Sequence, residues 1–217
     1  MRRGLFGGTF DPIHLGHLDV ARAARRALDL DEVVLLPSNV PPHRAAPHAS
    51  AAHRFAMAAL AVQHDEGLMV SDLEMQSTGP SYTSTTLDRL EAQGIDTSTL
   101  FFVIGADAFR DILTWKDYPR LLDRCHFVVV SRPSCRTSSL RTALPALADR
   151  WMDAPCDVPS TPRIFLVDAA TAPVSSTDVR RRIADGASLS GWVPDAVAAH
   201  IDRHSLYRPA MIEQGGS

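Results

Sequence analysis

The sequence lacks the features that mark secreted, membrane-spanning and nucleic-acid-binding proteins. It has no apolar run of membrane-spanning length, and glycines and an aspartate interrupt its first eleven residues too early for a signal peptide. The three cysteines, Cys125, Cys135 and Cys156, are odd in number and show no C-x-x-C spacing, which argues against a disulfide framework or a zinc cluster. A net charge of −3 gives no general reason to expect binding to nucleic acid or to a membrane. We therefore expect a cytoplasmic protein that binds neither nucleic acid nor membrane.

Short apolar segments alternate with longer helical patterns along most of the chain. Segments rich in β-branched and aromatic residues predict strands at Gly4–Phe6, Glu32–Leu36, Met69–Leu73, Leu100–Ile104, Phe127–Val130 and Ile164–Val167. Apolar spacing predicts helices at Leu18–Leu28, Ala51–Gln63, Thr83–Ala92 and Leu140–Met152. This alternation predicts an α/β fold with a doubly wound, mostly parallel sheet. We expect a single domain over residues 1–207 and a disordered tail over 208–217.

The segment Gly7–His17 is the most informative part of the sequence. It reads GGTFDPIHLGH, follows the first predicted strand and leads into an alanine-rich helix. Free backbone N–H groups and the helix dipole favour an anion at such a helix start. His14 and His17 add two imidazoles, so the segment predicts a site that handles phosphate. Taken singly, the glycine pair also fits a turn, and the histidine pair also fits surface residues or half of a metal site.

The same eleven residues resemble the (T/S)-F-D-x-x-H-x-G-H signature of the nucleotidyltransferase superfamily. The GGTFDPxHxGH form is most similar to bacterial nicotinate-nucleotide adenylyltransferases, and the resemblance extends from Gly7 to Tyr207. It implies a Rossmann-like nucleotidyltransferase fold. It also implies a reaction of NAD biosynthesis, in which ATP and nicotinate mononucleotide give nicotinate adenine dinucleotide and pyrophosphate. Mg²⁺ is expected to arrive with ATP, and no metal is expected to be held by protein residues alone.

Two later segments resemble the ATP-binding elements of this family. Ile104–Asp107 matches the I-G-A-D element, and Val174–Arg180 resembles I-S-S-T-x-I-R. Together with the first motif they assign ATP binding to Gly8, Thr9, Phe10, His17, Gly105, Asp107, Ser176, Thr177 and Arg180. The implied catalytic residues are His14, His17 and Arg180. Their expected role is to stabilise negative charge on the phosphates during transfer.

Two further segments resemble the family's mononucleotide-binding loops, each with one departure. Pro37–Arg44 follows P-x-x-x-P-P-H-K except that Arg44 replaces the usual lysine, and arginine binds phosphate with a different geometry. Ser81–Leu87 follows S-Y-T-x-D-T-L except that Thr85 replaces the usual aspartate, which removes a carboxylate from a helix start. These loops imply mononucleotide binding by His43, Arg44, Tyr82 and Thr83. Trp115 matches the family's tryptophan after the G-A-D element, which the resemblance implies packs against the pyridine ring.

Structural roles and other functions remain open at this point. Asp107 also fits a helix cap, Ser175 with Asp178 fits a capping box, and Trp115 fits the core. The chain also fits an enzyme of the superfamily acting on another phosphate acceptor, including nicotinamide mononucleotide. A nucleotide-binding sensor without activity is a third alternative, which the intact histidines of the motif disfavour. Homo-oligomerisation is left open.

The remaining histidines show no ligand spacing and are expected at the surface or at helix caps. They are His48, His53, His64, His126, His200 and His204.

Overall fold

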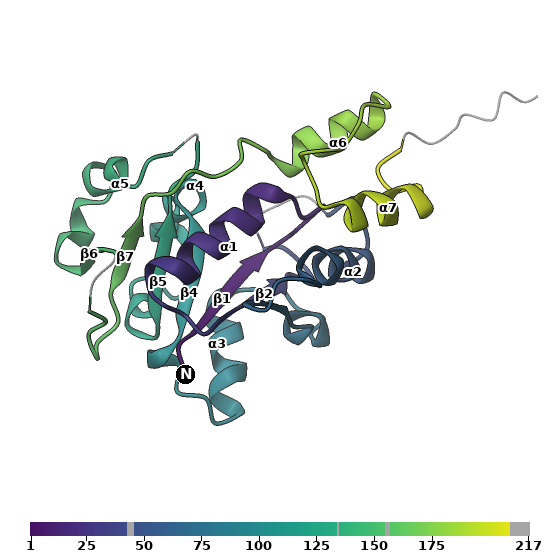
Figure 1. Cartoon of the computed structure of the whole chain (residues 1–217). Helices are drawn as coiled ribbons and strands as arrows, with labels where there is room; N and C mark the ends of the chain where they lie inside the picture. The colour runs from purple at the N-terminus through teal and green to yellow at the C-terminus, as the bar shows by residue number, and fades with distance from the viewer. Residues whose placement is uncertain (43–45, 134, 155–156, 209–217) are drawn as a thin grey trace, which may run out of the picture.

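A seven-stranded parallel sheet forms the centre of the molecule (Figure 1). The computed structural model describes residues 1–42, 46–133, 135–154 and 157–208. The strands are β1 (Arg3–Gly8), β2 (Glu32–Pro37), β3 (Leu68–Val70), β4 (Phe101–Gly105), β5 (His126–Val130), β6 (Trp151–Asp153) and β7 (Ile164–Val167). Their order in the sheet is β3-β2-β1-β4-β5-β7-β6, and all six pairings are parallel. The chain therefore reverses direction across the sheet between β1 and β4, where doubly wound sheets bind ligands.

Alternate side chains of each strand enter two different hydrophobic cores, as the two-residue period of a strand requires. In β4, Phe101 and Val103 join one core, whereas Phe102 and Ile104 join the other. Strand β5 repeats this pattern, with buried side chains throughout. Burial on both faces explains why these strands are continuous apolar runs in the sequence.

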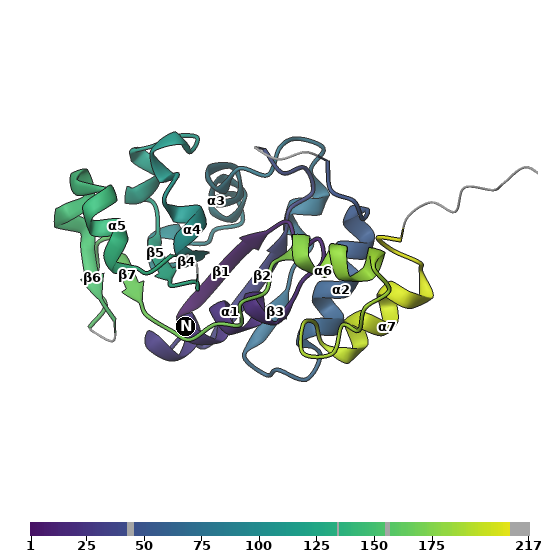
Figure 2. The same cartoon turned by 90° about the horizontal axis from the view of Figure 1, so that it is seen from above.

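One face of the sheet, called the α1 face below, is covered by four helices. They are α1 (Leu15–Ala27), α2 (Ala51–Val62), α6 (Ser176–Ala184) and α7 (Asp195–Arg203). Helix α1 crosses the sheet, and α7 lies beside α2 at one end of it (Figures 1 and 2). The C-terminal helices are thus brought back to the part of the sheet that holds β1 and β2.

The opposite face, called the α3 face, is covered by shorter elements. Its helices are α3 (Thr83–Ala92), α4 (Ala106–Phe109) and α5 (Ser138–Ala143). Figure 2 shows α3 and α4 on the other side of the sheet from α1. Short 3₁₀ segments complete the chain: η1 (Leu73–Gln76), η2 (Thr97–Thr99), η3 (Ile112–Thr114), η4 (Arg120–Asp123) and η5 (Pro145–Arg150).

The parallel α/β fold and five of the six predicted strands are confirmed, whereas one predicted helix and the bounds of the remaining strand are wrong. The helix predicted over Leu140–Met152 stops at α5, continues as 3₁₀ turn η5 and ends in strand β6. Pro145 causes this break, because proline has no N–H and excludes the helical conformation from the residue before it. The strand predicted over Met69–Leu73 is Leu68–Val70, and Leu73 begins a 3₁₀ turn.

Within the described residues, no helix is long and apolar enough to cross a membrane. Of the tail predicted over 208–217, only Arg208 is described, and its guanidinium donates to Asp202 at 2.8 Å. Residues 209–217 lie outside the described part of the chain.

Candidate active site

A cavity of about 760 Å³ lies at the carboxyl ends of β1 and β4. Every described residue that the sequence assigns to the site lines it: Gly8, Thr9, Phe10, His14, His17, Tyr82, Thr83, Gly105, Asp107, Trp115, Ser176, Thr177 and Arg180. His43 and Arg44, also assigned to the site, lie outside the described residues. A smaller cavity of about 370 Å³, near Arg3 and Glu32, is lined by none of the assigned residues that the structure describes.

The last residue of β1 lies so close to the turn that follows it that this position needs glycine. A Cβ atom on Gly8 would lie 2.7 Å from the ring of Phe10. Phe10 itself is buried and adopts a left-handed backbone with φ of 48°, a conformation that costs about 1–3 kcal/mol in a non-glycine residue. Its ring packs edge-on against Phe6 and His17, with centroids 5.5 and 5.0 Å apart. Packing thus holds the turn in one shape beside the histidines.

Helix α1 begins at the two histidines of the motif. His14 is the N-cap residue, so the helix starts three residues before the predicted Leu18. The two imidazole rings stack with centroids 3.7 Å apart. The backbone N–H of His14 donates to Nδ1 of His17 at 3.3 Å. An Nδ1 that accepts carries no proton, so the neutral ring of His17 carries its proton on Nε2.

His14 is a neutral residue over the physiological pH range. Its side chain is only 1% exposed. Burial and the nearby Arg132 guanidinium lower the pKa of His14 to about 3, against a smaller opposing effect of Asp178. Among the described residues, nothing hydrogen-bonds to its buried Nδ1. His14 therefore offers an uncharged imidazole at the cavity wall.

Asp11 joins the first motif to the loop before α2 and to the end of the chain. Its carboxylate accepts hydrogen bonds from the backbone N–H groups of His48 and Ala49, at 2.8 and 3.0 Å, and from the Tyr207 hydroxyl at 2.8 Å. Burial, followed by the contact with Asp11, raises the pKa of Tyr207, so the phenol stays protonated and donates. The guanidinium of Arg180 donates to the Asp11 carbonyl oxygen at 2.6 Å. The prediction that His48 is a surface or capping residue is incomplete, because His48 also lines the cavity.

The start of helix α6 forms a second wall of the cavity. Ser175 is its N-cap: the hydroxyl accepts from the Asp178 backbone N–H at 3.1 Å and donates to the Asp178 carboxylate at 2.7 Å. The capping role predicted from the sequence is confirmed. The hydroxyl of Ser176 donates to the carbonyl oxygen of Pro12 at 2.9 Å, so the α6 helix start is tied to the first motif.

Two arginines bring positive charge to these helix starts. Arg180 is largely buried and also donates to the hydroxyl of Thr177 at 3.2 Å. Arg132 donates to the carbonyl oxygens of Gly16 and Val174, at 3.2 and 3.4 Å, and lines the cavity. Sequence reasoning missed Arg132. The available signal was its position two residues after β5, at the same edge of the sheet as the other site residues.

The α3 face supplies an aromatic wall. Tyr82 and Thr83 lie at the start of α3, and Trp115 follows η3. Trp115 packs edge-on against Phe102 with centroids 6.2 Å apart, so it belongs both to the core and to the cavity lining. The Lys116 ammonium lies 5.0 Å from the centre of the Tyr82 ring. Lys116, the only lysine of the chain, was not predicted as a site residue.

A buried carboxylate lies behind this aromatic wall. The hydroxyl of Thr86 donates to the side chain of Glu74, and both residues are buried and line the cavity. Thr85, which stands where the family has aspartate, is half-buried and is absent from the described cavity lining. The site therefore has a carboxylate beside α3, but it is Glu74 of η1 and not a residue of α3 itself. Sequence reasoning missed Glu74 because its partner is twelve residues away.

A fully buried arginine holds the loops at this edge together. Arg54 on α2 is 1% exposed and donates to four carbonyl oxygens. Their donor–acceptor distances are 2.9 Å to Thr9, 2.6 Å to Ser38, 3.1 Å to Asn39 and 3.2 Å to Ala49. These carbonyls belong to the loops that follow β1 and β2 and to the loop that precedes α2. Arg54 was also missed, because nothing in its local sequence marks it as buried.

Comparison with known proteins gives concordant matches. A family model described as cytidylyltransferase-like matches residues 5–182. A probable nicotinate-nucleotide adenylyltransferase of Roseiflexus sp. (strain RS-1) is 42% identical over 207 residues, covering 94% of this chain and 97% of that protein. One from Thermus thermophilus is 42% identical over 208 residues, covering 96% and 100%. The structure of Plasmodium falciparum nicotinic acid mononucleotide adenylyltransferase complexed with NaAD superposes with a TM-score of 0.73 at 17% identity, covering 94% and 96%, a likeness of fold.

Proposed function

This chain belongs to the nicotinate-nucleotide adenylyltransferase family, and we propose that its cavity transfers the adenylyl group of ATP to nicotinate mononucleotide. A phosphate oxygen of the mononucleotide attacks the α-phosphorus of ATP, and the bond from that phosphorus to the bridging oxygen of the β-phosphate breaks. The products are nicotinate adenine dinucleotide, an intermediate of NAD biosynthesis, and pyrophosphate. We propose that the reaction takes place in the cytoplasm.

The observation that carries the proposal is the meeting of two helix starts, two histidines and two arginines in one cavity. The N-termini of α1 and α6 both favour phosphate oxygens. Arg180 and Arg132 add fixed positive charge beside them. Transfer between two polyanions needs positioning and charge neutralisation more than it needs a base. The attacking phosphate is already anionic at neutral pH, since its second pKa is about 6.

We assign the transition-state contact to His17. In the neutral ring, Nδ1 accepts from the His14 backbone, so Nε2 is left as the donor. We propose that this N–H donates to the α-phosphate as negative charge builds up there. His14 is neutral and buried, and its proposed role is a second, uncharged donor. Ser176, Thr177 and Arg180 hold the β- and γ-phosphates that leave as pyrophosphate.

The mononucleotide is proposed to occupy the aromatic wall. Trp115 offers an apolar surface for the pyridine ring, and Tyr82 and Thr83 lie beside it with a polar helix start. We also include His43 and Arg44 in this subsite, as the family pattern implies. For the remainder of the ATP molecule, the strand ends at Gly8–Phe10 and Gly105–Asp107 provide backbone groups and one carboxylate.

We propose that ATP binds together with Mg²⁺, which neutralises phosphate charge when it is bound. The cavity wall fits such an ion, since the exposed Asp111 provides carboxylate oxygens that the ATP assignment above leaves unused. Asp11 is the less suitable carboxylate, because two backbone N–H groups and a phenol already donate to it. The protein would then supply few direct ligands, in keeping with an ion held mainly by phosphates and water.

Two substitutions at His17 separate its catalytic role from its role at the helix start. The side-chain oxygen of His17→Asn can replace Nδ1 as an acceptor for His14, but nothing replaces Nε2. We expect kcat to fall about 100-fold or more, the cost of one preorganised donor, with little change in thermal stability. His17→Gln places an amide N–H near the position of Nε2 and should recover part of the activity.

The matched control is His64→Asn, which changes an exposed histidine outside the cavity. It should retain the wild-type kcat. A loss of less than threefold in His17→Asn would refute the assignment of His17.

A further inference from the structure

Three histidines outside the cavity gather where the C-terminal helix meets α2. His53 lies in the first turn of α2, His200 lies on α7, and His204 is the C-cap residue of α7. Helices α2 and α7 lie side by side in both Figures 1 and 2. The imidazole nitrogens that could act as ligands all lie within 4.8 Å of one another. His53 and His200, 147 positions apart in the sequence, thus meet at one point with His204.

The spacing of these nitrogens is close to that of a tetrahedral metal site. Nδ1 of His53 and Nε2 of His200 are 3.1 Å apart. Two imidazole nitrogens on one tetrahedral Zn²⁺ are about 3.3 Å apart, given Zn–N bonds of about 2.0–2.1 Å. His200 and His204 are four residues apart, so they lie on the same side of α7. The centroid of the His204 ring lies 4.8 Å from that of His53 and 4.4 Å from that of His200.

We propose that His53, His200 and His204 bind a divalent transition-metal ion, with Zn²⁺ as the ion that the geometry fits best. Imidazole ligands suit Zn²⁺, Co²⁺, Ni²⁺ and Cu²⁺, and three of them leave a fourth position for water. His204 is exposed, so an ion reaches the site from solvent without opening the fold. Imidazole binds metals in its neutral form.

The ion would fix the C-terminal helix in place behind the active site. Downstream of α7, the Tyr207 hydroxyl donates to Asp11 in the cavity wall. Next to His53 on α2, Arg54 holds the loops at the strand ends. A bound metal therefore joins two helices that both support the cavity, while its ligands remain outside the cavity lining. This role is independent of the proposed adenylyl transfer.

The competing explanation is a metal-free cluster joined by the hydrogen bond between His53 and His200. The charged groups nearby do not decide between the two. Arg203 opposes a cation, whereas Asp202 is paired with Arg208 at 2.8 Å. The two explanations differ in one measurable property, which is stoichiometric affinity for metal.

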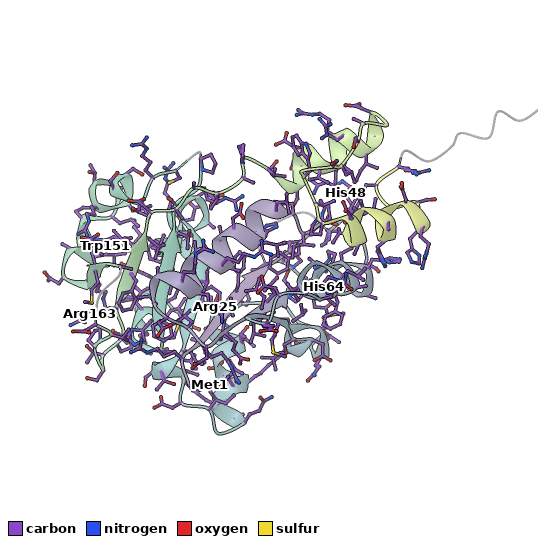
Figure 3. The ribbon with its side chains drawn as sticks, viewed as in Figure 1. Met1, Arg25, His48, His64, Trp151 and Arg163 are labelled. Carbon is purple, nitrogen blue, oxygen red and sulfur yellow. The ribbon has the colours of Figure 1, made fainter. Side chains whose placement is uncertain are left out.

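The test titrates the full-length, chelator-stripped protein with Zn²⁺ in competition with a chromogenic chelator, without ATP. We expect one equivalent of Zn²⁺ to bind. His53→Ala, His200→Ala and His204→Ala should each weaken binding by more than about 100-fold, the upper range for loss of even an outer-shell partner. The matched control is His64→Ala, which changes an exposed histidine that follows the C-terminal end of α2, whereas His53 lies in the first turn of that helix. Figure 3 labels His64. The affinity of the His64→Ala variant for Zn²⁺ should equal that of the wild type.

A second measurement follows stability. Zn²⁺ at 100 times the wild-type Kd should raise the folding equilibrium constant of the wild type about 100-fold, and that of His204→Ala by no more than about twofold. Co²⁺ in the same site should give the intense visible absorption of a tetrahedral complex. Absence of stoichiometric binding, or binding that His204→Ala does not weaken, would overturn the proposal. So would Zn²⁺ binding that is lost in His14→Ala or His17→Ala, since the ion would then lie in the cavity with these two histidines. None of these readouts depends on adenylyl transfer activity.

Discussion

Two buried histidines should make the protein lose stability in mild acid, and His126 allows the cause to be isolated. His126 is 2% exposed and packs against the rings of Phe101 and Phe165, with centroids 4.9 and 5.5 Å away. Its Nδ1 accepts from the Arg163 backbone N–H at 3.1 Å. Burial, followed by the positive charge of Arg163, lowers the pKa of His126 to about 4. Protonation of Nδ1 would break this hydrogen bond and place a charge in the core.

The sign and size of the effect follow from proton linkage. An unfolded histidine binds a proton below pH 6.5, but folded His126 binds one only near pH 4, and folded His14 only near pH 3. Between these values the unfolded state holds more protons, so the free energy of unfolding decreases as the pH falls. Each histidine contributes a slope of about 1.4 kcal/mol per pH unit. From pH 7 to pH 5 each therefore removes about 2 kcal/mol, and the pair removes about 4 kcal/mol.

Urea unfolding of the wild type and of His126→Asn at pH 7, 6 and 5 measures this slope. The asparagine side-chain oxygen can accept from Arg163 in place of Nδ1, and it does not titrate. We expect the slope between pH 6 and pH 5 to fall by about 1.4 kcal/mol per pH unit in the variant. His64→Asn, an exposed control, should keep the wild-type slope. If His126→Asn also keeps that slope, the folded protein binds the proton without cost and the reasoning is wrong.

Two further substitutions test the supports of the site. Arg54→Met should lower the free energy of unfolding, measured by urea denaturation, by about 3–5 kcal/mol, because it leaves buried carbonyl oxygens without their donor. A loss under about 1 kcal/mol would show that water replaces the guanidinium. Ser175→Ala should cost about 1 kcal/mol and lower Tm by about 2–4 °C through loss of the α6 N-cap. An unchanged Tm in calorimetry would contradict the capping role.

The sequence predicts this fold well where a pattern is local. Continuous apolar strands separated by amphipathic helices identify the parallel sheet, and motifs that end strands identify its carboxyl edge. The helix predicted over Leu140–Met152 shows the limit of periodicity. Its apolar spacing is helical, yet Pro145 ends the α-helix. The residues that follow form strand β6, which is stabilised by pairing with β7. Such pairing is a tertiary effect that local spacing cannot report.

The candidate site shows the same contrast between local signals, which the sequence reports, and long-range contacts, which it does not. Its motif residues lie in short contiguous segments, so sequence alone identifies them. Arg54, Arg132 and Glu74 act through partners that are distant in the sequence, and their local patterns are those of ordinary surface residues. The cluster around His200 was missed for the same reason, since His53 completes it from another helix. The prediction that these histidines lack ligand spacing is therefore corrected by the fold.

The most direct test of the proposed function is pyrophosphate release by the purified protein with MgATP and a set of phosphate acceptors. Nicotinate mononucleotide, nicotinamide mononucleotide and phosphopantetheine should be compared at equal concentration. We predict turnover with nicotinate mononucleotide, with nicotinate adenine dinucleotide as the product. ATP binding without pyrophosphate release from any acceptor, or turnover with phosphopantetheine alone, would contradict adenylyl transfer to a pyridine mononucleotide.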